Sequence, residues 1–379
     1  MKKGMIVGIF LIAIVVLGYF VLMPKQSENE KEVIKIGAIL PLSGDVAVYG
    51  KSLQNGMNLA LEVFREENPE YKDILIIYED SKAEPKLAVS AFQKLSSIDN
   101  CKIILGGFSS SEVLSMAPIA EKNKVVLISP TASSPSITSA GDYIFRTTPS
   151  DNFDGEIMAK FAYYELSLKD VALLYVNNDY GLGISKVFMN KFENYGGKIA
   201  IQKSFESDTK DFKTILISIK EKNPDGLYII ATSELGNLLK QKTELGLTTK
   251  TFTVGLVENH KVVEVAGKGA DSVFYSYPSF QVNSSNNVVK EFVSDYKNKY
   301  GNNPDVLGAY GYDLVGITLM ALKDNSESSE KIKTALYNII DYQGVTGKTS
   351  FDKNGDVSKT AGIKIILDGK FKWFINNFN

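Results

Sequence analysis

"KIILGGFSSSE", residues 102–112, runs from an apolar strand through a pair of glycines into a serine-rich helix start. A continuous apolar run is typical of a parallel strand that is buried on both faces. Glycines let the backbone approach a ligand closely, and the first turn of a helix favours an anion. The stretch therefore predicts an α/β fold with an anion-binding loop, although Ser109 and Glu112 alone also fit a capping box without a ligand.

The same alternation of strand and helix recurs on both sides of this stretch. A first series has strands at 33–40, 73–80, 102–107 and 124–130, with helices at 50–66, 85–97 and 110–122. A second series has strands at 170–176, 198–205, 225–232, 251–256 and 271–277, with helices at 152–166, 181–195, 210–222 and 233–245. Polar, turn-rich residues 131–150 separate the two series. The two series of alternating strands and helices predict two doubly wound parallel-sheet lobes.

The C-terminal part of the chain predicts a return between the lobes. Helices are expected near 286–300 and 306–322, and a last strand at 362–367. We assign to lobe one about 33–143 plus 281–340, and to lobe two about 144–276 plus 341–379. A chain that crosses between the lobes more than once forms a multi-stranded hinge.

The composition argues against several classes of protein. A formal net charge of -2, without a basic run, argues against nucleic-acid binding. Cys101 and His260 are the only cysteine and histidine, which excludes an intramolecular disulfide and disfavours zinc binding and Ser-His-Asp catalysis. "GVTGKT" (344–349) lacks the first glycine of a P-loop. "FDKNGD" (351–356) lacks the acid spacing of an EF-hand, so a polar turn is expected there. We expect neither an enzyme nor a cofactor or metal.

The N-terminus predicts a membrane segment. Lys2 and Lys3 precede the apolar run "MIVGIFLIAIVVLGYFVLM" at residues 5–23, which would cover about 28 Å as a helix. The run is longer than a usual signal-peptide core, and no A-x-A site follows it. We expect an uncleaved signal anchor at 1–24, a polar tether at 25–32 and an extracytoplasmic remainder. A cleaved signal peptide is the alternative.

Three loops of the first series have ligand-binding chemistry. They are "PLSGDVAVYG" (41–50), the glycine–serine stretch with Phe108 and Ser109, and "SPTASS" (129–134) with Thr131 and Ser133. Two hydroxyl-rich helix starts side by side predict a cup for a carboxylate. In the second series "NNDYGLG" (177–183) places Tyr180 at the carboxyl end of a strand, and Tyr49 holds a similar place in lobe one. Two roles are open for these tyrosines: they cover a ligand between the lobes, or they pack at the start of their helices.

Four motifs in order resemble the periplasmic Leu/Ile/Val-binding protein family. They are "IKIGAILPLSGDVAVYGKSLQNGMNLALEVF" (34–64), "GGFSSSEVLSMAPIAEKNKVVLISPTASSP" (106–135), "NNDYGLG" and "GVTGKTSFDKNGD" (344–356). The resemblance covers about 33–379. It implies the type I periplasmic-binding-protein fold, with a small molecule bound between two closing lobes. It also implies an ABC permease in the membrane as the partner.

The resemblance also implies roles for individual residues. It implies that the hydroxyl groups of Ser109 and Ser133 hold a ligand α-carboxylate, with the backbone of Thr131 contributing. Tyr180 and Tyr49 fall on the tyrosines of the family. Phe108 is the remaining candidate of lobe one.

Two departures from the family leave the ligand's amino group open. Ala231 stands where an aromatic residue is common, and Leu256 or Val257 stands where an acid that pairs with the ligand ammonium is expected. Either Glu258 takes that role through a shift of its loop, or the ligand has no amino group. We therefore expect a transporter receptor for an aliphatic amino acid, branched-chain for example. The alternative is an anchored sensor or a binder of a non-amino carboxylate or small amide.

Overall fold

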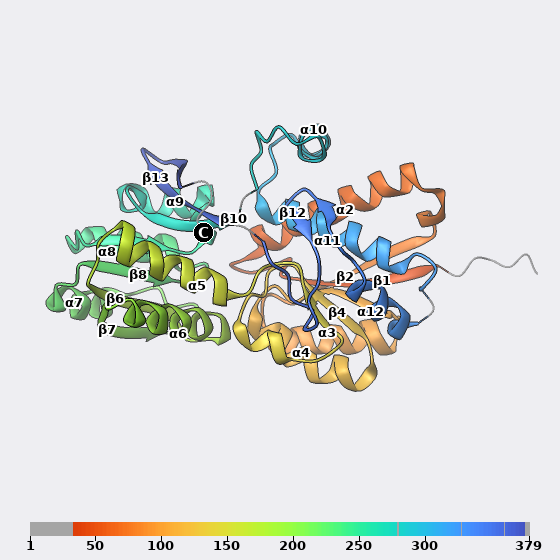
Figure 1. Cartoon of the computed structure of the whole chain (residues 1–379), viewed down its shortest axis with the longest axis horizontal. Helices are drawn as coiled ribbons and strands as arrows, with labels where there is room; N and C mark the ends of the chain where they lie inside the picture. The colour runs from red at the N-terminus through yellow and green to blue at the C-terminus, as the bar shows by residue number, and fades with distance from the viewer. Residues whose placement is uncertain (1–32, 279, 327, 360, 376–379) are drawn as a thin grey trace, which may run out of the picture.

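A computed structural model describes residues 33–278, 280–326, 328–359 and 361–375. It has two lobes side by side, each built on one β-sheet (Figure 1). In lobe one, five parallel strands lie in the order β2-β1-β3-β4-β5. Their bounds are β1 Ile34–Leu40, β2 Ile74–Asp80, β3 Ile103–Gly106, β4 Val126–Ser129 and β5 Ile144–Arg146. The continuous apolar runs give strands such as β3 that are buried along their length.

Helices cover both faces of this sheet. One face packs against α3 and α4, because α3 carries Ala88, Ala91, Phe92 and Leu95 on one side. The other face packs against α2, α11 and α12. The bounds are α2 Ala47–Glu67, α3 Pro85–Ser97, α4 Ser110–Asn123, α10 Asn287–Tyr300, α11 Val306–Leu322 and α12 Ser329–Tyr337. Short elements are η1 Pro69–Tyr71, η2 Pro135–Ser139 and the hairpin β11 Tyr342–Gly344 with β12 Gly347–Thr349.

Lobe two has a sheet of seven strands in the order β14-β13-β10-β9-β8-β6-β7. Parallel strands are β6 Asp170–Val176, β7 Lys198–Phe205, β8 Gly226–Ile230, β9 Lys250–Thr253 and β10 Phe274–Pro278. At one edge, β13 Ala361–Leu367 and β14 Lys370–Ile375 run antiparallel. The helices are α5 Asp151–Lys160 with the π turn η3 Phe161–Glu165, α6 Asp179–Asn194, α7 Lys213–Lys222, α8 Leu235–Glu244 and α9 His260–Ala266. Two 3-10 turns, η4 Gly255–Val257 and η5 Gly267–Ala270, flank α9.

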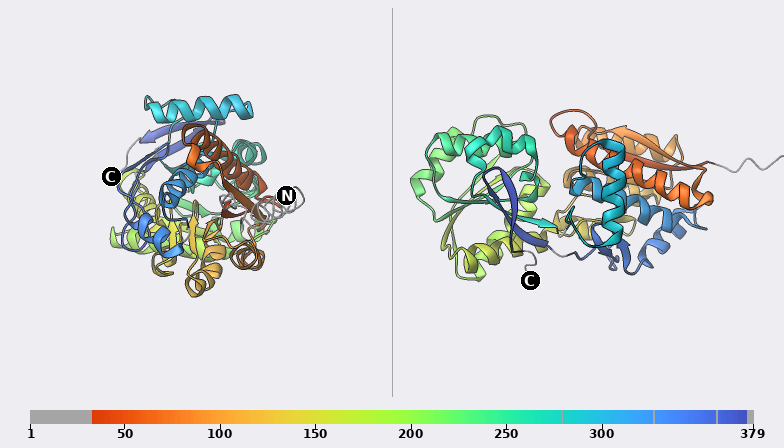
Figure 2. Two further views of the ribbon diagram at one scale, coloured as in Figure 1. Left: turned by 90° about the vertical axis from the view of Figure 1, so that its right-hand side faces the viewer. Right: turned by 90° about the horizontal axis from the view of Figure 1, so that it is seen from above.

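The chain passes between the lobes repeatedly. Residues 147–150 lead from β5 to α5, the chain returns between β10 and α10, and it passes again between Val357 and β13. Figure 2 shows β13 and β14 in dark blue against the green lobe, while α10 in cyan lies on the other lobe. The sequence predicts residues 341–379 in lobe two, whereas Phe351 and Val357 pack in the core of lobe one. Of the described residues between 341 and 375, those in β13 and β14 join the second sheet.

The predicted α/β architecture with parallel sheets is confirmed, and two strands, 170–176 and 198–205, have the predicted bounds. The antiparallel edge of lobe two, β14 and the short β5 are not predicted by the sequence pattern. The signal anchor expected at 1–24 and the tether at 25–32 lie outside the described residues. Within the described part of the chain, no helix has both the length and the apolar character needed to cross a membrane.

Candidate functional site

The strand order places a ligand site between the lobes. In lobe one the order reverses between β1 and β3, and in lobe two between β6 and β8. Ligands of doubly wound sheets bind beyond the carboxyl ends of the strands at such points. The loops that follow these strands line part of a cavity of about 200 Å³. That volume suits a small metabolite, because pockets for drug-sized ligands measure roughly 300–1,000 Å³. All seven residues predicted from the sequence line it: Tyr49, Phe108, Ser109, Thr131, Ser133, Tyr180 and Glu258.

Ser109 forms the capping box that the sequence pattern permits, and it also lines the cavity. Its hydroxyl donates to Glu112 Oε2 at 2.8 Å and accepts from the Glu112 N–H at 3.3 Å. Its own N–H donates to Glu112 Oε2 at 2.6 Å. Burial raises the pKa of Glu112. A serine hydroxyl has one proton, so Ser109 cannot donate to a ligand without giving up its bond to Glu112.

The second serine-rich loop is tied to the first. The Thr131 hydroxyl donates to the Phe108 carbonyl at 2.7 Å, and the Ser134 N–H donates to Ser110 Oγ at 3.1 Å. The hydroxyls of Ser109 and Thr131 are therefore engaged within the protein. The first N–H groups of α4, at Ser110 and Ser111, have no intrahelical acceptor, as at any helix N-terminus. These groups, rather than the two hydroxyls, are the donors best placed for an anion.

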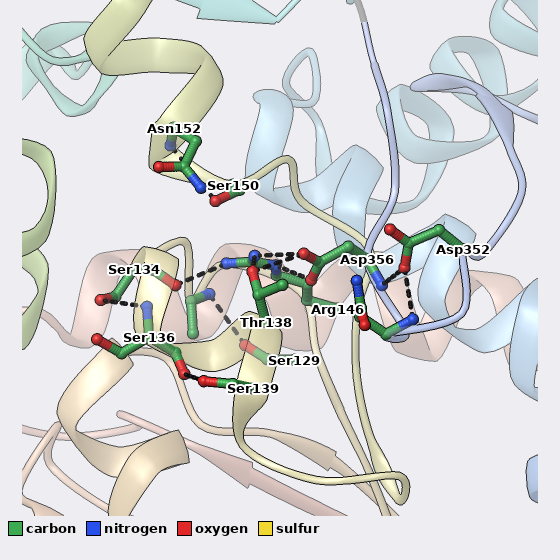
Figure 3. Close-up of polar contacts among 12 residues, drawn as sticks. Ser129, Ser134, Ser136, Thr138, Ser139, Arg146, Ser150, Asn152, Asp352 and Asp356 are labelled. Atoms are coloured by element: carbon green, nitrogen blue, oxygen red, sulfur yellow. Dashed lines mark hydrogen bonds and ion pairs between the residues drawn. The ribbon is translucent and has the colours of Figure 1, made fainter. Parts of the chain in front are cut away.

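A buried ion pair holds the second serine-rich loop, residues 129–134, in place (Figure 3). Arg146 at the end of β5 is fully buried and binds Asp356 in a bidentate manner, with Nε–Oδ1 at 2.6 Å and Nη2–Oδ2 at 2.9 Å. It also donates to the Ser134 carbonyl at 2.9 Å and to Thr138 Oγ1 at 2.8 Å. Asp352 accepts from the N–H groups of residues 354 and 356, which makes "FDKNGD" the predicted turn. Arg146 is not among the residues predicted from the sequence.

Aromatic side chains from both lobes face the cavity. Tyr49, on α2, and Phe108 are buried in lobe one and stack with ring centroids 5.8 Å apart and planes 8° apart. Tyr180 lies in the first turn of α6, where Asn178 caps the helix through the Gly181 N–H at 2.9 Å. Burial raises the pKa of Tyr180, and Asp151, Asp154 and Tyr49 raise it further. These rings therefore give the cavity apolar walls with hydroxyl groups at their edges.

Glu258 lines the cavity, but other groups of lobe two already bind its carboxylate. Oε2 accepts from the Tyr275 hydroxyl at 2.6 Å and from Lys364 Nζ. Lys364 lies on β13 and is buried, with Nζ 4.4 Å from the centre of the Tyr277 ring. The negative charge of Glu258 is therefore compensated within the protein.

Two further acids line the cavity and were not predicted from the sequence. Asp151 and Asp154 lie in the first turn of α5, and Asp151 is only 3% exposed. Burial raises the pKa of Asp151 well above its usual range, Asp154 adds to the rise, and Ser133 and Arg146 oppose it. Burial also raises the pKa of Asp154, against a hydrogen bond from Ser276. The signal in the sequence is the pair of acids in "PSDNFD" (149–154), directly after the first passage between the lobes.

The cavity lining is acidic. Among the described residues that form it are four carboxyl groups and no lysine, arginine or histidine; the acids are Asp151, Asp154, Glu258 and Asp305. Asp305 caps α11 by accepting from the Gly308 N–H at 2.9 Å, and the Ser52 hydroxyl also donates to it. Within the described ranges no three His, Cys, Asp or Glu side chains group in a way that could hold a metal ion.

Two doubly wound lobes, with a cavity where their switch points face each other, define the type I periplasmic-binding-protein architecture. The chain belongs to the periplasmic binding protein family, whose model matches residues 33–363. The resemblance expected from the sequence motifs is thus confirmed.

Relatives of known name cover most of the chain. The leucine-, isoleucine-, valine-, threonine- and alanine-binding protein of Pseudomonas aeruginosa is 28% identical over 332 residues, 86% of this chain and 87% of that protein. The leucine-binding protein LivK of Thermotoga maritima superimposes with a TM-score of 0.86 at 29% identity, over 92% of this chain and 99% of that one. A solute-binding protein of an ABC transporter from Rhodopseudomonas palustris, in complex with 3,4-dihydroxybenzoic acid, gives 0.80 at 25% identity, over 90% and 96%.

Proposed function

We propose that this chain is the solute-binding component of an ABC transporter and binds an aliphatic amino acid, such as a branched-chain one, between its two lobes. The observation that carries the proposal is the small cavity at the facing switch points, with aromatic walls and the N-terminus of α4. The names of the relatives from Pseudomonas and Thermotoga support this ligand class. No covalent step is needed, so we propose a binding protein and not an enzyme.

The residues predicted from the sequence take these roles. The N–H groups at the N-terminus of α4, with Ser133 and the Thr131 backbone, hold the carboxylate of the ligand, and Ser109 orders this helix start through its bonds to Glu112. Tyr49 and Phe108 form the lobe-one wall, and Tyr180 closes over the ligand from lobe two. Further contacts that cross between the lobes support closure. The Asp179 N–H lies 3.4 Å from Ser111 Oγ, and Lys210 pairs with Asp45 at 2.9 Å.

We also propose how the chain meets its membrane partner. Residues 1–24 act as an uncleaved signal anchor, 25–32 as a tether, and the lobes lie outside the cytoplasm, where a permease receives the closed form. The apolar run at 5–23 after two lysines supports this arrangement. Mass spectrometry of the native protein tests it: an intact N-terminal segment is expected, and a mature N-terminus near Ser27 would overturn it.

Thermal unfolding of the purified protein against a ligand panel tests the function. The panel contains all amino acids, the deaminated acids of leucine, isoleucine and valine, and simple amides. A ligand at about 100 times its dissociation constant stabilises by ~2.7 kcal/mol, which raises the melting temperature by several degrees. A shift with leucine, isoleucine or valine is expected. A panel without any shift would overturn the proposal.

A second candidate ligand is a carboxylate without an amino group. The neutralised state of Glu258 favours it, because the acid expected to bind an ammonium is already paired with Lys364. The relative that binds 3,4-dihydroxybenzoic acid supports it as well. A shift with deaminated acids alone would establish this candidate. An anchored sensor with the same ligands would differ from a transporter receptor only in its partner, so failure to stimulate a reconstituted permease would favour the sensor.

A further inference from the structure

We infer that Asp151 and Asp154, and not Glu258, bind the ammonium group of the ligand. The inference rests on the proposed function, since it requires an amino acid in the cavity. It assigns the amino end to the first turn of α5, directly after the chain leaves lobe one. The ligand class that follows is an amino compound rather than a deaminated acid.

Asp151 and Asp154 both face the cavity between the lobes. They are three residues apart on α5, so they lie on the same face of the helix, and both line the cavity. The N-terminus of α5 does not depend on them for its cap. Ser150 is the N-cap and accepts from the Asn152 N–H at 3.3 Å (Figure 3). The acids therefore have no capping role, and none explains the burial of Asp151.

Asp151 carries an unsatisfied oxygen. Its Oδ2 is buried and has no hydrogen-bond partner among the described residues, although a buried carboxylate normally has one. The guanidinium of Arg146 is held by Asp356, Thr138 and the Ser134 carbonyl. A buried acid without a cation is costly unless a ligand supplies the cation or a proton neutralises the acid.

Glu258 is in the opposite situation. Its Oε2 already accepts two hydrogen bonds, and one donor is the ammonium of the buried Lys364. Binding a ligand ammonium there would place two cations on one carboxylate or expel Lys364 from its aromatic surroundings. Lys364 Nζ lies 4.4 Å from the Tyr277 ring centre and 5.1 Å from that of Trp373, which supports its place there.

The main-chain connection completes the geometry. The Asp151 N–H donates to the Ser133 carbonyl at 2.8 Å, so the acid lies next to the loop that faces the ligand carboxylate. An α-amino acid carries its ammonium and its carboxylate on the same carbon atom. One ligand head group can therefore contact the α4 N-terminus with its carboxylate and Asp151 with its ammonium.

Calorimetric titration of the full chain tests the inference through the ratio of the affinity for an amino acid to the affinity for its 2-oxo acid. Affinities are measured for leucine, isoleucine and valine and for their 2-oxo acids, in the wild type and in Asp151→Asn, Asp154→Asn and Glu258→Gln. We expect the wild type to prefer the amino acid by about a hundredfold or more, and Asp151→Asn to remove most of that preference. Glu156→Gln is the matched control, since Glu156 lies on the same helix and pairs with Lys191 at 2.8 Å. It should keep both affinity and preference.

The outcomes separate the inference from the proposed function. If Glu258→Gln removes the preference and Asp151→Asn keeps it, the ammonium site is at Glu258 and the inference is overturned. If the wild type binds only 2-oxo acids, the solute-binding role survives and the ammonium site does not. If nothing on the panel binds, the proposed function itself fails. The melting temperature of the ligand-free protein tests whether Asp151 has a purely structural role. In that case Asp151→Asn should lower the melting temperature. If Asp151 binds the ligand instead, the melting temperature of the variant should stay the same or rise.

Discussion

The buried ion pair between Arg146 and Asp356 allows a quantitative test of how lobe one holds its ligand loop. The substitution Asp356→Ala removes two charge-assisted bonds of 2.6 and 2.9 Å from a guanidinium that has no exposed surface. Breaking a buried pair by removing one partner costs about 3–5 kcal/mol. The Ser134 carbonyl and Thr138 still accept from Arg146, so we expect a loss near the lower end, about 3 kcal/mol.

Urea unfolding with two probes measures this loss in the lobe concerned. Trp373, the only tryptophan, lies on β14 and reports lobe two by fluorescence, whereas far-ultraviolet circular dichroism reports both lobes. The variant should move the dichroism transition to lower urea and separate it from the fluorescence transition. Two probes are needed because a two-lobed chain need not unfold in a single step.

The control is Lys94→Ala on α3, which removes exposed ion pairs with Glu79 and Asp99 at 2.7 and 2.9 Å. Exposed pairs contribute little, so the midpoint should barely move. A loss in Asp356→Ala of less than about 1 kcal/mol, or one equal to the control, would refute the reasoning that burial gives this pair its strength. Ligand affinity should fall with stability, because Arg146 holds the Ser134 carbonyl of the ligand loop.

Three more outcomes are expected. Ser133→Ala should weaken amino acid binding about tenfold to a hundredfold in calorimetry, while Ser109→Ala should also lower the unfolding free energy by about 1 kcal/mol because it breaks the capping box. Burial raises the pKa of Asp151, so the folded state holds its proton more tightly than the unfolded state does. The contribution of Asp151 to ligand-free stability should therefore fall as pH rises from about 4, and Asp151→Asn should remove that part of the pH dependence in thermal scans from pH 4 to 8. Lys210→Ala, which removes the exposed contact to Asp45, should speed ligand release in stopped flow by less than about fivefold, an effect that high salt should abolish.

The fold could be predicted from the sequence because its main signal is local. Buried parallel strands read as apolar runs, and the helices between them have apolar faces at helical spacing, as in α3. The antiparallel β14 carries alternating lysine and aromatic residues, so it lacks the continuous apolar run by which the parallel strands are found. The tail from Phe351 to Val357 packs in lobe one because Asp356 pairs with Arg146, a contact between residues 210 positions apart.

The site was predictable only in part, for a related reason. Loops at strand ends can be found from glycines and serines, and all seven predicted residues line the cavity. Their partners cannot be found in this way. That the Ser109 proton is held by Glu112 is a local contact, which the capping-box pattern does anticipate. That Glu258 is neutralised by Lys364, 106 positions away, requires the pairing of β10 with β13. Asp151 was missed because it ends the turn-rich stretch between the two series.

The place of the acids bears on the order of events in binding. Asp151 is bonded through its N–H to Ser133 of lobe one, and it lies at the first passage between the lobes rather than on the far side of lobe two. Because Asp151 directly follows residues 147–150 and its N–H is bonded to lobe one, it moves less relative to the α4 N-terminus than the rest of lobe two does when the lobes rotate about these residues. Both charged ends of an amino acid could be bound while lobe two, with Tyr180, is still open. Closure would then add mainly aromatic cover, and the head group would contribute affinity before the lobes meet.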